Sequence, residues 1–158
     1  MKPPNFVDVL RAKKVVDRYL QPTPLHSYPR LSKLLGVELH VKHENHQPLG
    51  AFKVRGGINL ISRLSPQEKD AGVIAASTGN HGQSVAYAAR LFGVRAIIGV
   101  PVGANADKVA SMEALGAEVE FHGKDFDEAR EWVEDQTRLH GYRYIHSANE
   151  PLLIAGVG

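Results

Sequence analysis

The chain has 158 residues, of which 43% are hydrophobic and 23% are charged, a composition typical of a globular domain large enough for its own core. Its 19 basic and 17 acidic residues give a net charge of +2, so charge provides no case for binding nucleic acid or an acidic membrane. The absence of cysteine excludes disulfides and thiolate metal sites.

The sequence also lacks the apolar segments that direct a chain into or across a membrane. No apolar run reaches the ~18 residues that a membrane span needs. The N-terminal stretch MKPPNFVDVLRAKK has no apolar core of the kind that signal peptides carry. We therefore expect no membrane association and a cytoplasmic location.

The first third of the chain predicts helices separated by proline-rich loops. A helix is expected over residues 5–20, with Asn5 as its N-cap. The stretch QPTPLHSYPRLSKLLG predicts a proline-broken loop and then a short helix that Gly36 ends. Residues 37–42 alternate in polarity and are expected to form a strand, and a helix follows around 52–63.

The remaining chain alternates short apolar runs with longer amphipathic ones. Strands are expected at 72–77, 94–101, 117–122 and 142–146, and helices around 81–92, 105–115 and 125–139. Strands separated by helices of this length predict an α/β fold with a parallel sheet and helices on both faces, which is a three-layer arrangement. Ligands of such sheets bind beyond the carboxyl ends of the strands, which draws attention to the loops 43–52 and 77–81.

Lys53 is the first candidate for chemistry. It follows a Gly50-Ala51-Phe52 turn near the start of the helix expected around 52–63. The positive end of a helix and apolar neighbours both disfavour a protonated amine, and a neutral amine can form a Schiff base. The alternative is an ordinary solvated lysine, and the local residues by themselves favour that alternative.

The turn Ser77-Thr78-Gly79-Asn80-His81 is the second candidate. Hydroxyl groups, a flexible glycine and the free N–H groups of a helix start suit such a turn to a carboxylate or a phosphate. Serine, threonine and asparagine are also ordinary helix caps, so a plain capped helix start stays open. His81 could act as a donor there or simply fill the first helical turn.

Other site patterns are weak or absent. His40, His43 and His46 recur every third residue, but they run from a strand into a proline loop, so we expect surface histidines and no metal site. The sequence has no dinucleotide fingerprint, no Walker P-loop and no Gly-x-Ser-x-Gly elbow of serine hydrolases.

Two longer stretches together resemble one enzyme family. The segment TPLHSYPRLSKLLGVELHVKHENHQPLGAFKVRGGINLISRLS, followed by GVIAASTGNHGQSVAYAARLFGVRAIIGVP, is similar to the fold-type II pyridoxal-phosphate enzymes. The nearest branch is that of threonine/serine dehydratases (ammonia-lyases) and serine racemase. The resemblance runs from about Thr23 to the last residue. It implies the α/β fold of the tryptophan synthase β type, incomplete here, and pyridoxal 5'-phosphate as the cofactor.

The resemblance implies a role for each residue of the two motifs. Lys53 matches the lysine that holds the cofactor as a Schiff base and later removes the α-proton of the substrate. Phe52 matches the aromatic residue beside the pyridine ring, and Asn80 matches the asparagine that hydrogen-bonds the phenolic oxygen of the cofactor. The loop that grips the substrate carboxylate is matched by Ser77, Thr78, Gly79, Asn80 and His81.

The chain departs from the family pattern in several ways. Ala51 stands where the family commonly has a serine. Thr78 stands where the racemases have a serine as their second acid/base, and because its methyl group restricts rotation we disfavour racemisation. Arg55 and Gln83 belong to the motifs and are given supporting roles only. The glycine-rich phosphate cradle, the residue facing the pyridine nitrogen and the acidic cation site lie further along the family's chain.

The combined prediction is therefore the N-terminal half of an enzyme. Residues 1–48 are expected to form the N-terminal segment of a large domain, residues 49–145 a small α/β domain, and residues 146–158 the start of the return to the large domain. The apolar ending PLLIAGVG agrees with a fragment or with a chain that needs a partner surface.

The expected reaction is the β-elimination of a hydroxy amino acid, which gives a 2-oxo acid and ammonia once the missing half is present. The alternatives are a serine racemase or another enzyme of this cofactor class, or a non-catalytic binding module. The expected partners are a small amino-acid substrate, together with a second copy or another chain that associates through the exposed half-domain surface.

Overall fold

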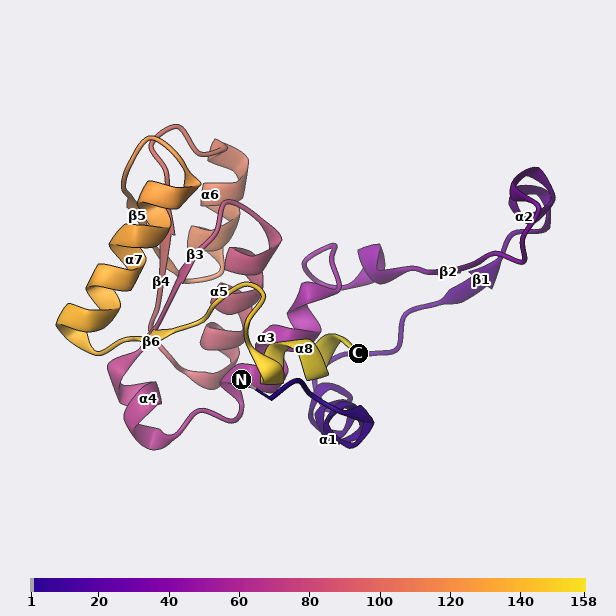
Figure 1. Ribbon diagram of the computed structural model, residues 1–158, viewed down its shortest axis with the longest axis horizontal. Coiled ribbons are helices and arrows are strands. Elements are labelled where there is room, and N and C mark those ends of the chain that lie inside the picture. Colours follow the sequence, from indigo (N-terminus) through magenta and orange to yellow (C-terminus); the bar gives the residue numbers. More distant parts are fainter. Residues whose placement is uncertain (1) are drawn as a thin grey trace.

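The computed structural model describes residues 2–158, and Figure 1 shows an α/β body from which a narrow arm extends. The first helix, α1 (Phe6–Val16), is capped by Asn5, whose side chain and that of Asp8 form the reciprocal bonds of a capping box. The Asn5 cap is confirmed, but the helix ends at Val16 and does not reach residue 20.

The arm is built differently from the sequence prediction. It consists of β1 (Leu25–Ser27), α2 (Pro29–Leu35) and β2 (His40–Lys42), and the two strands pair antiparallel as a sheet of their own. The expected loop before α2 thus contains a strand. The strand expected over 37–42 is shorter and does not join the parallel sheet.

The body contains the strand–helix units that the sequence predicts. The elements after the arm are η1 (Glu44–His46), α3 (Lys53–Ile61), α4 (Pro66–Ala71), β3 (Val73–Ala76), α5 (Asn80–Phe92), β4 (Ala96–Val100), α6 (Ala106–Ala114), β5 (Glu118–Phe121), α7 (Phe126–His140), β6 (Arg143–Tyr144) and α8 (Pro151–Val157). The sheet order is β5-β4-β3-β6, and every pair is parallel. The parallel α/β class is confirmed, while α8 was not expected.

Alternate residues of the central strands face opposite helix layers. Val73 and Ala75 of β3 belong to the larger core, which α3, α5 and α6 cover. Ile74 and Ala76 belong to a smaller core with Val133 of α7 on the other face. Strands buried on both faces are what a parallel sheet requires. The three layers visible in Figure 1 are therefore α7, the sheet, and the group of α5 and α6.

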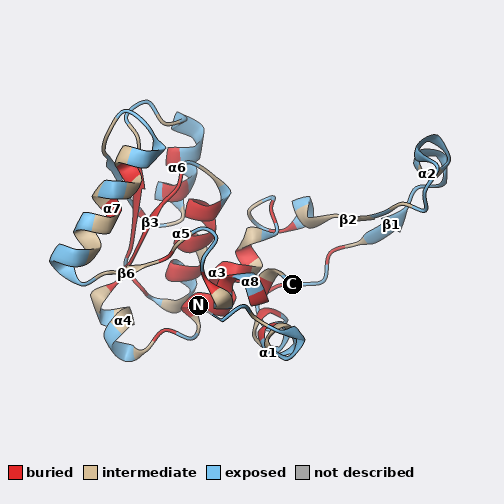
Figure 2. Ribbon diagram, viewed as in Figure 1, coloured by how far each residue is buried: buried red, intermediate tan, exposed pale blue. Residues whose placement is uncertain are grey.

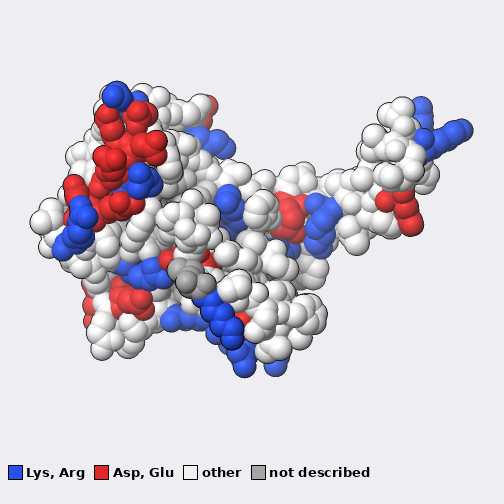
Figure 3. All heavy atoms as spheres, viewed as in Figure 1, with Lys and Arg blue, Asp and Glu red and all other residues white. Residues whose placement is uncertain are grey.

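Acidic side chains gather on one face of the body. Figure 3 shows acidic side chains gathered over α7, which carries five acidic and two basic residues in its sequence. Arg130 pairs there with Glu134 and Asp127. These exposed pairs contribute little stability, so this acidic face is a solvated helix surface.

Helix α3 lies at the centre of the fold. Every residue of α3 except Lys53 and Arg55 is buried (Figure 2). A Cβ on Gly57 would lie 2.7 Å from the Ser84 carbonyl oxygen of α5, and one on Gly56 would lie 2.7 Å from the Leu153 carbonyl oxygen of α8. The two adjacent glycines therefore let two other helices approach the backbone of α3.

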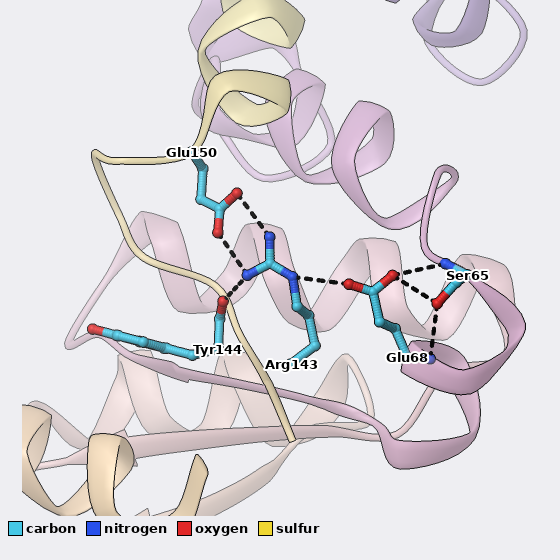
Figure 4. Close-up of polar contacts among 5 residues, drawn as sticks. All are labelled: Ser65, Glu68, Arg143, Tyr144 and Glu150. Atoms are coloured by element: carbon cyan, nitrogen blue, oxygen red, sulfur yellow. Dashed lines mark hydrogen bonds and ion pairs between the residues drawn. The ribbon is translucent and has the colours of Figure 1, made fainter. Parts of the chain in front are cut away.

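A polar cluster fastens the start of α8 to the edge of the sheet. Figure 4 shows the Arg143 guanidinium of β6 between two carboxylates. It donates to both oxygens of Glu150, at 2.7 and 2.9 Å, and pairs with Glu68 of α4 at 3.2 Å. Ser65 caps α4: its hydroxyl accepts from the Glu68 N–H, and the Glu68 carboxylate accepts from the Ser65 N–H. This cluster fixes where α8 begins, and hence how it meets α3.

His81 links α5 to the chain that follows β6. Its side chain is only 5% exposed, and its Nε2 lies 3.0 Å from the Ile145 carbonyl oxygen. A carbonyl can only accept, so Nε2 carries the proton. Burial lowers the pKa of His81; the Ile145 bond opposes this shift, and the charge of Lys53 adds to it. The imidazole is therefore held neutral.

The close approach at Gly57 gives the first prediction. In an exposed helix, replacing glycine by alanine stabilises by about 1 kcal/mol. Gly57→Ala should instead lower the free energy of unfolding by about 1–3 kcal/mol, because the methyl group collides with α5. Urea unfolding followed by circular dichroism measures the difference. Gln67→Ala, at an exposed position of α4, is the control, and a stabilised Gly57→Ala protein would contradict the packing.

The buried neutral His81 gives the second prediction. The unfolded chain, with a histidine pKa near its ordinary value of about 6.5, binds a proton that the folded state resists. The free energy of unfolding should therefore fall as the pH drops below about 6.5. His81→Gln keeps an N–H for Ile145 and cannot titrate, so its stability should depend less on pH in that range.

Urea unfolding at a series of pH values measures this dependence. The control is His140→Gln, because His140 is exposed at the end of α7 and its replacement should keep the wild-type slope. If His81→Gln and the wild type lose stability equally between about pH 6.5 and 5, the burial of a neutral imidazole is not the cause.

Candidate functional site

Lys53 is the first residue of α3, as the sequence led us to expect, and Phe52 occupies the N-cap position. The Lys53 Nζ lies 5.5 Å from the centroid of the Phe52 ring. The preceding turn passes through Gly50, whose φ of +63° favours glycine, and the Gly50 N–H donates to the Gln47 carbonyl. Phe52 is 47% exposed, so it shields the amine on one side only.

The turn after β3 has a closed side and an open side. Ser77 is buried, and its Oγ accepts from the N–H groups of Gly79 and Gly82 at 3.2 and 2.8 Å. The N-cap residue of α5 is Gly79, and the Ser77 hydroxyl, two residues earlier, occupies the Gly82 N–H of the first helical turn. On the open side, the side chains of Thr78 and Asn80 are exposed.

Free N–H groups complete the open side of this turn. Asn80 and His81 are the first two residues of α5, where backbone N–H groups have no intrahelical carbonyl to bond. The side chain of His81 is committed to Ile145, which leaves its backbone N–H as the group that a ligand can reach. Sequence reasoning placed His81 in the turn correctly but could not show that its imidazole lies buried.

The structure brings Lys53 and this turn together. The Ser84 hydroxyl of α5 donates to the Lys53 carbonyl at 2.6 Å, which ties the start of one helix to the second turn of the other. The charge of Lys53 helps to lower the pKa of His81, so the amine lies within electrostatic reach of the turn. The helix that begins with Lys53 and its neighbouring Phe52 is thus joined to the helix that begins at this turn.

An ion pair that sequence reasoning missed lies behind Lys53. Arg55 donates from Nε and Nη2 to the two carboxylate oxygens of Glu44, at 2.7 and 2.9 Å, and both side chains are less than one-fifth exposed. The Thr23 hydroxyl also donates to Glu44, and Lys42 donates to the Thr23 carbonyl at 2.6 Å. Chiefly because Arg55 bonds it, the pKa of Glu44 is lowered to about 2.

Gln47 is a further residue that the sequence did not single out. It is 5% exposed, and its side-chain nitrogen has no hydrogen-bond partner in the described part of the chain. Neither Gln47 nor Glu44 stands in a periodic pattern, so only their membership of the lysine motif could have drawn attention to them.

His40, His43 and His46, which recur every third residue, do not converge on one point. His40 contacts Glu38, whereas the ring of His43 lies 5.4 Å from that of His46 and 5.4 Å from that of His26. In the described part of the chain, no group of three or more His, Cys, Asp or Glu side chains is placed to bind a metal ion. Among residues 2–158, none of the helices has the length and apolar character needed to cross a bilayer.

Several known proteins are similar to this chain in sequence and in fold. The L-threonine ammonia-lyase of Thermotoga maritima is 40% identical over 151 residues, which are 96% of this chain and 38% of that protein. The structure of maize serine racemase superposes with a TM-score of 0.91 at 29% identity, and covers 98% of this chain and 47% of the racemase. The processed threonine deaminase isoform 2 of Solanum lycopersicum gives a TM-score of 0.86 at 34% identity, and the match covers 98% of this chain and 45% of the deaminase.

These relatives are longer than the chain, which spans less than half of each. The family model described as pyridoxal-phosphate dependent enzyme matches residues 16–158 and so includes Lys53 and the Ser77–His81 turn. The chain belongs to the family of pyridoxal-phosphate dependent enzymes.

Proposed function

We propose that this chain supplies the lysine-bearing part of an ammonia-lyase site that converts a hydroxy amino acid into a 2-oxo acid and ammonia. The observation that supports the proposal is that the Lys53 backbone is hydrogen-bonded to α5, the helix that follows the open turn, and that Lys53 acts electrostatically on His81 at the start of that helix. Threonine ammonia-lyase and threonine deaminase among the relatives support this reaction.

The residues present fit part of the cofactor. An amine can bond an aldehyde, the half-exposed Phe52 ring offers a face to a planar heterocycle, and Asn80 offers an amide to a polar substituent. When bound, pyridoxal phosphate supplies an electron sink for a carbanion. We assign no group of this chain to its phosphate, since the family resemblance puts the phosphate cradle further along.

The turn orients the substrate, and Lys53 moves the proton. The Asn80 and His81 N–H groups and the Thr78 hydroxyl bind the substrate carboxylate, which points the α-carbon toward Lys53. Lys53 accepts the α-proton at Nζ and passes it on to the leaving β-hydroxyl. The β-hydroxyl leaves with a proton as water, and hydrolysis of the resulting enamine gives the 2-oxo acid and ammonia.

The remaining sequence predictions belong to this proposal. Since the chain covers 47% of maize serine racemase and 38% of the threonine ammonia-lyase, we propose that turnover needs a C-terminal part at least as long as this chain. Residues 1–48 and 146–158 then belong to a large domain, and residues 49–145 to a small one. The proposal includes a cytoplasmic enzyme that takes a small amino acid and forms a homo-oligomer, or associates through its exposed apolar surface.

Serine racemase is the second candidate, because its maize structure superposes on this chain with a TM-score of 0.91. Thr78 argues for elimination. In the racemase resemblance this position holds a serine that serves as the second acid/base, and a threonine hydroxyl rotates less freely. A non-catalytic binding module is the third reading, which labelling of Lys53 tests.

Removal of Lys53 is the third prediction. Lys53→Ala should abolish covalent attachment of pyridoxal phosphate and lower turnover by at least about 10²–10⁴-fold, the usual contribution of a general base. Borohydride reduction followed by peptide mass spectrometry locates the modified lysine. Turnover is measured with a C-terminal half supplied in trans. Lys69→Ala, on α4, should behave as the wild type, and labelling scattered over many lysines would favour the binding module.

Thr78 gives the fourth prediction. Thr78→Ser should raise the ratio of D-amino acid to 2-oxo acid formed from L-serine, because the freed hydroxyl can deliver a proton to the opposite face of the α-carbon. Chiral chromatography and a 2-oxo acid assay measure the two products. Thr137→Ser, on α7, is the control. An unchanged product ratio would show that this position does not set the reaction type.

A further inference from the structure

The Glu44–Arg55 pair closes the loop that carries Lys53. Glu44 begins the short η1 helix, and Arg55 is the third residue of α3, so the pair joins the two ends of the segment that contains Gly50, Phe52 and Lys53. Two hydrogen bonds, at 2.7 and 2.9 Å, fix both the distance and the orientation of the planar guanidinium. The loop is thus tied at its base by a directional contact.

This contact is anchored to other parts of the molecule. The Thr23 hydroxyl donates to the same carboxylate, and the Thr23 carbonyl accepts from Lys42 of β2. With its side chain only 17% exposed, Glu44 is bonded from two sides and has little freedom to rotate. Its pKa, lowered to about 2 chiefly by the Arg55 hydrogen bonds, keeps it ionised at neutral pH.

The geometry of α3 relates the position of the Arg55 side chain to the direction in which Lys53 projects. Residues two apart in an α-helix project about 200° from each other around the axis, which puts them on nearly opposite sides. Arg55 lines a cavity of about 440 Å³ together with Glu44 and Phe52, and Lys53 does not line it. Lys53 instead lies within electrostatic reach of His81. Holding Arg55 on one side therefore turns Lys53 toward the other.

We propose that Glu44 and Arg55 are a positioning pair that directs the Lys53 amine toward the Ser77–Asn80 turn. The pair touches neither the substrate nor the cofactor in this scheme and acts only through the loop and the first turn of α3. The inference rests on the proposed function for the use of Lys53, whereas the restraint on the loop can be measured without any cofactor.

The loop restraint is tested by hydrogen exchange in the cofactor-free chain. Glu44→Gln keeps the shape of the side chain and removes its charge, which weakens both hydrogen bonds from Arg55. Amide exchange over residues 50–55, where the Gly50 and Arg55 N–H groups bond to the Gln47 and Phe52 carbonyls, should therefore rise by about tenfold or more. If Glu44→Gln does not fold by circular dichroism, Arg55→Lys, which keeps the charge but loses the fork, replaces it.

The matched control is Glu118→Gln. Arg95 bonds Glu118 in the same two-bond geometry, at 2.8 and 2.6 Å, across the exposed β4–β5 edge. This variant should leave amide exchange over residues 50–55 as in the wild type. Equal exchange of that segment in Glu44→Gln and Glu118→Gln would overturn the proposal.

Selective labelling tests the direction of Lys53. After treatment with pyridoxal phosphate and borohydride, the fraction of label on Lys53 relative to the other lysines should fall in Glu44→Gln and persist in Glu118→Gln. A loosened loop with wild-type labelling of Lys53 would make the pair merely structural and overturn the proposal. If Lys53 is never labelled in the wild-type protein, the proposed function is wrong. Amide hydrogen exchange would then decide by itself whether the Glu44–Arg55 pair restrains the loop.

Discussion

The packing of α3 between α5 and α8 is the constraint on which the site depends. Gly56, Gly57 and Gly156 leave no room for a Cβ where these helices meet. The helix is consequently buried along its whole length except at Lys53 and Arg55 in its first turn. A close-packed helix cannot rotate or slide to accommodate a ligand, so whatever chemistry α3 performs must take place at its N-terminus.

The electrostatics of that terminus follow from the same packing. The starts of α3 and α5 lie close together, and each contributes the partial positive charge of a helix N-terminus. His81 would add a further charge beside them, but its burial keeps it neutral. The arrangement favours an anion at the Ser77–Asn80 turn, and it keeps a second positive charge away from the region that Lys53 and this turn share.

The sequence predicts the body better than the arm. Glycines and capping residues divide the body into strand–helix units, and the apolar runs between them identify the parallel strands. The arm was missed because β1 is three exposed residues between prolines, held only by pairing with β2. Helix α8 was missed because PLLIAGVG has the composition of a strand or a loop, and its helical form depends on Gly156 meeting Gly56. Tertiary packing, not propensity, decides both segments.

Side-chain partners that are distant in sequence were beyond prediction for a related reason. Arg55–Glu44, Arg95–Glu118 and Arg143–Glu150 are all two-bond pairs, yet no spacing rule connects their members. Their surroundings also differ: the side chains of the first pair are 18% and 17% exposed, and those of the second 52% and 51%. Solvent screens an exposed ion pair, so the Arg95–Glu118 pair at the sheet edge restrains its surroundings little. The largely buried Arg55–Glu44 pair is screened less, so it restrains the loop beside Lys53. The function of such a pair depends on the other residues of the loop that it closes. The loop closed by Glu44 and Arg55 carries Lys53.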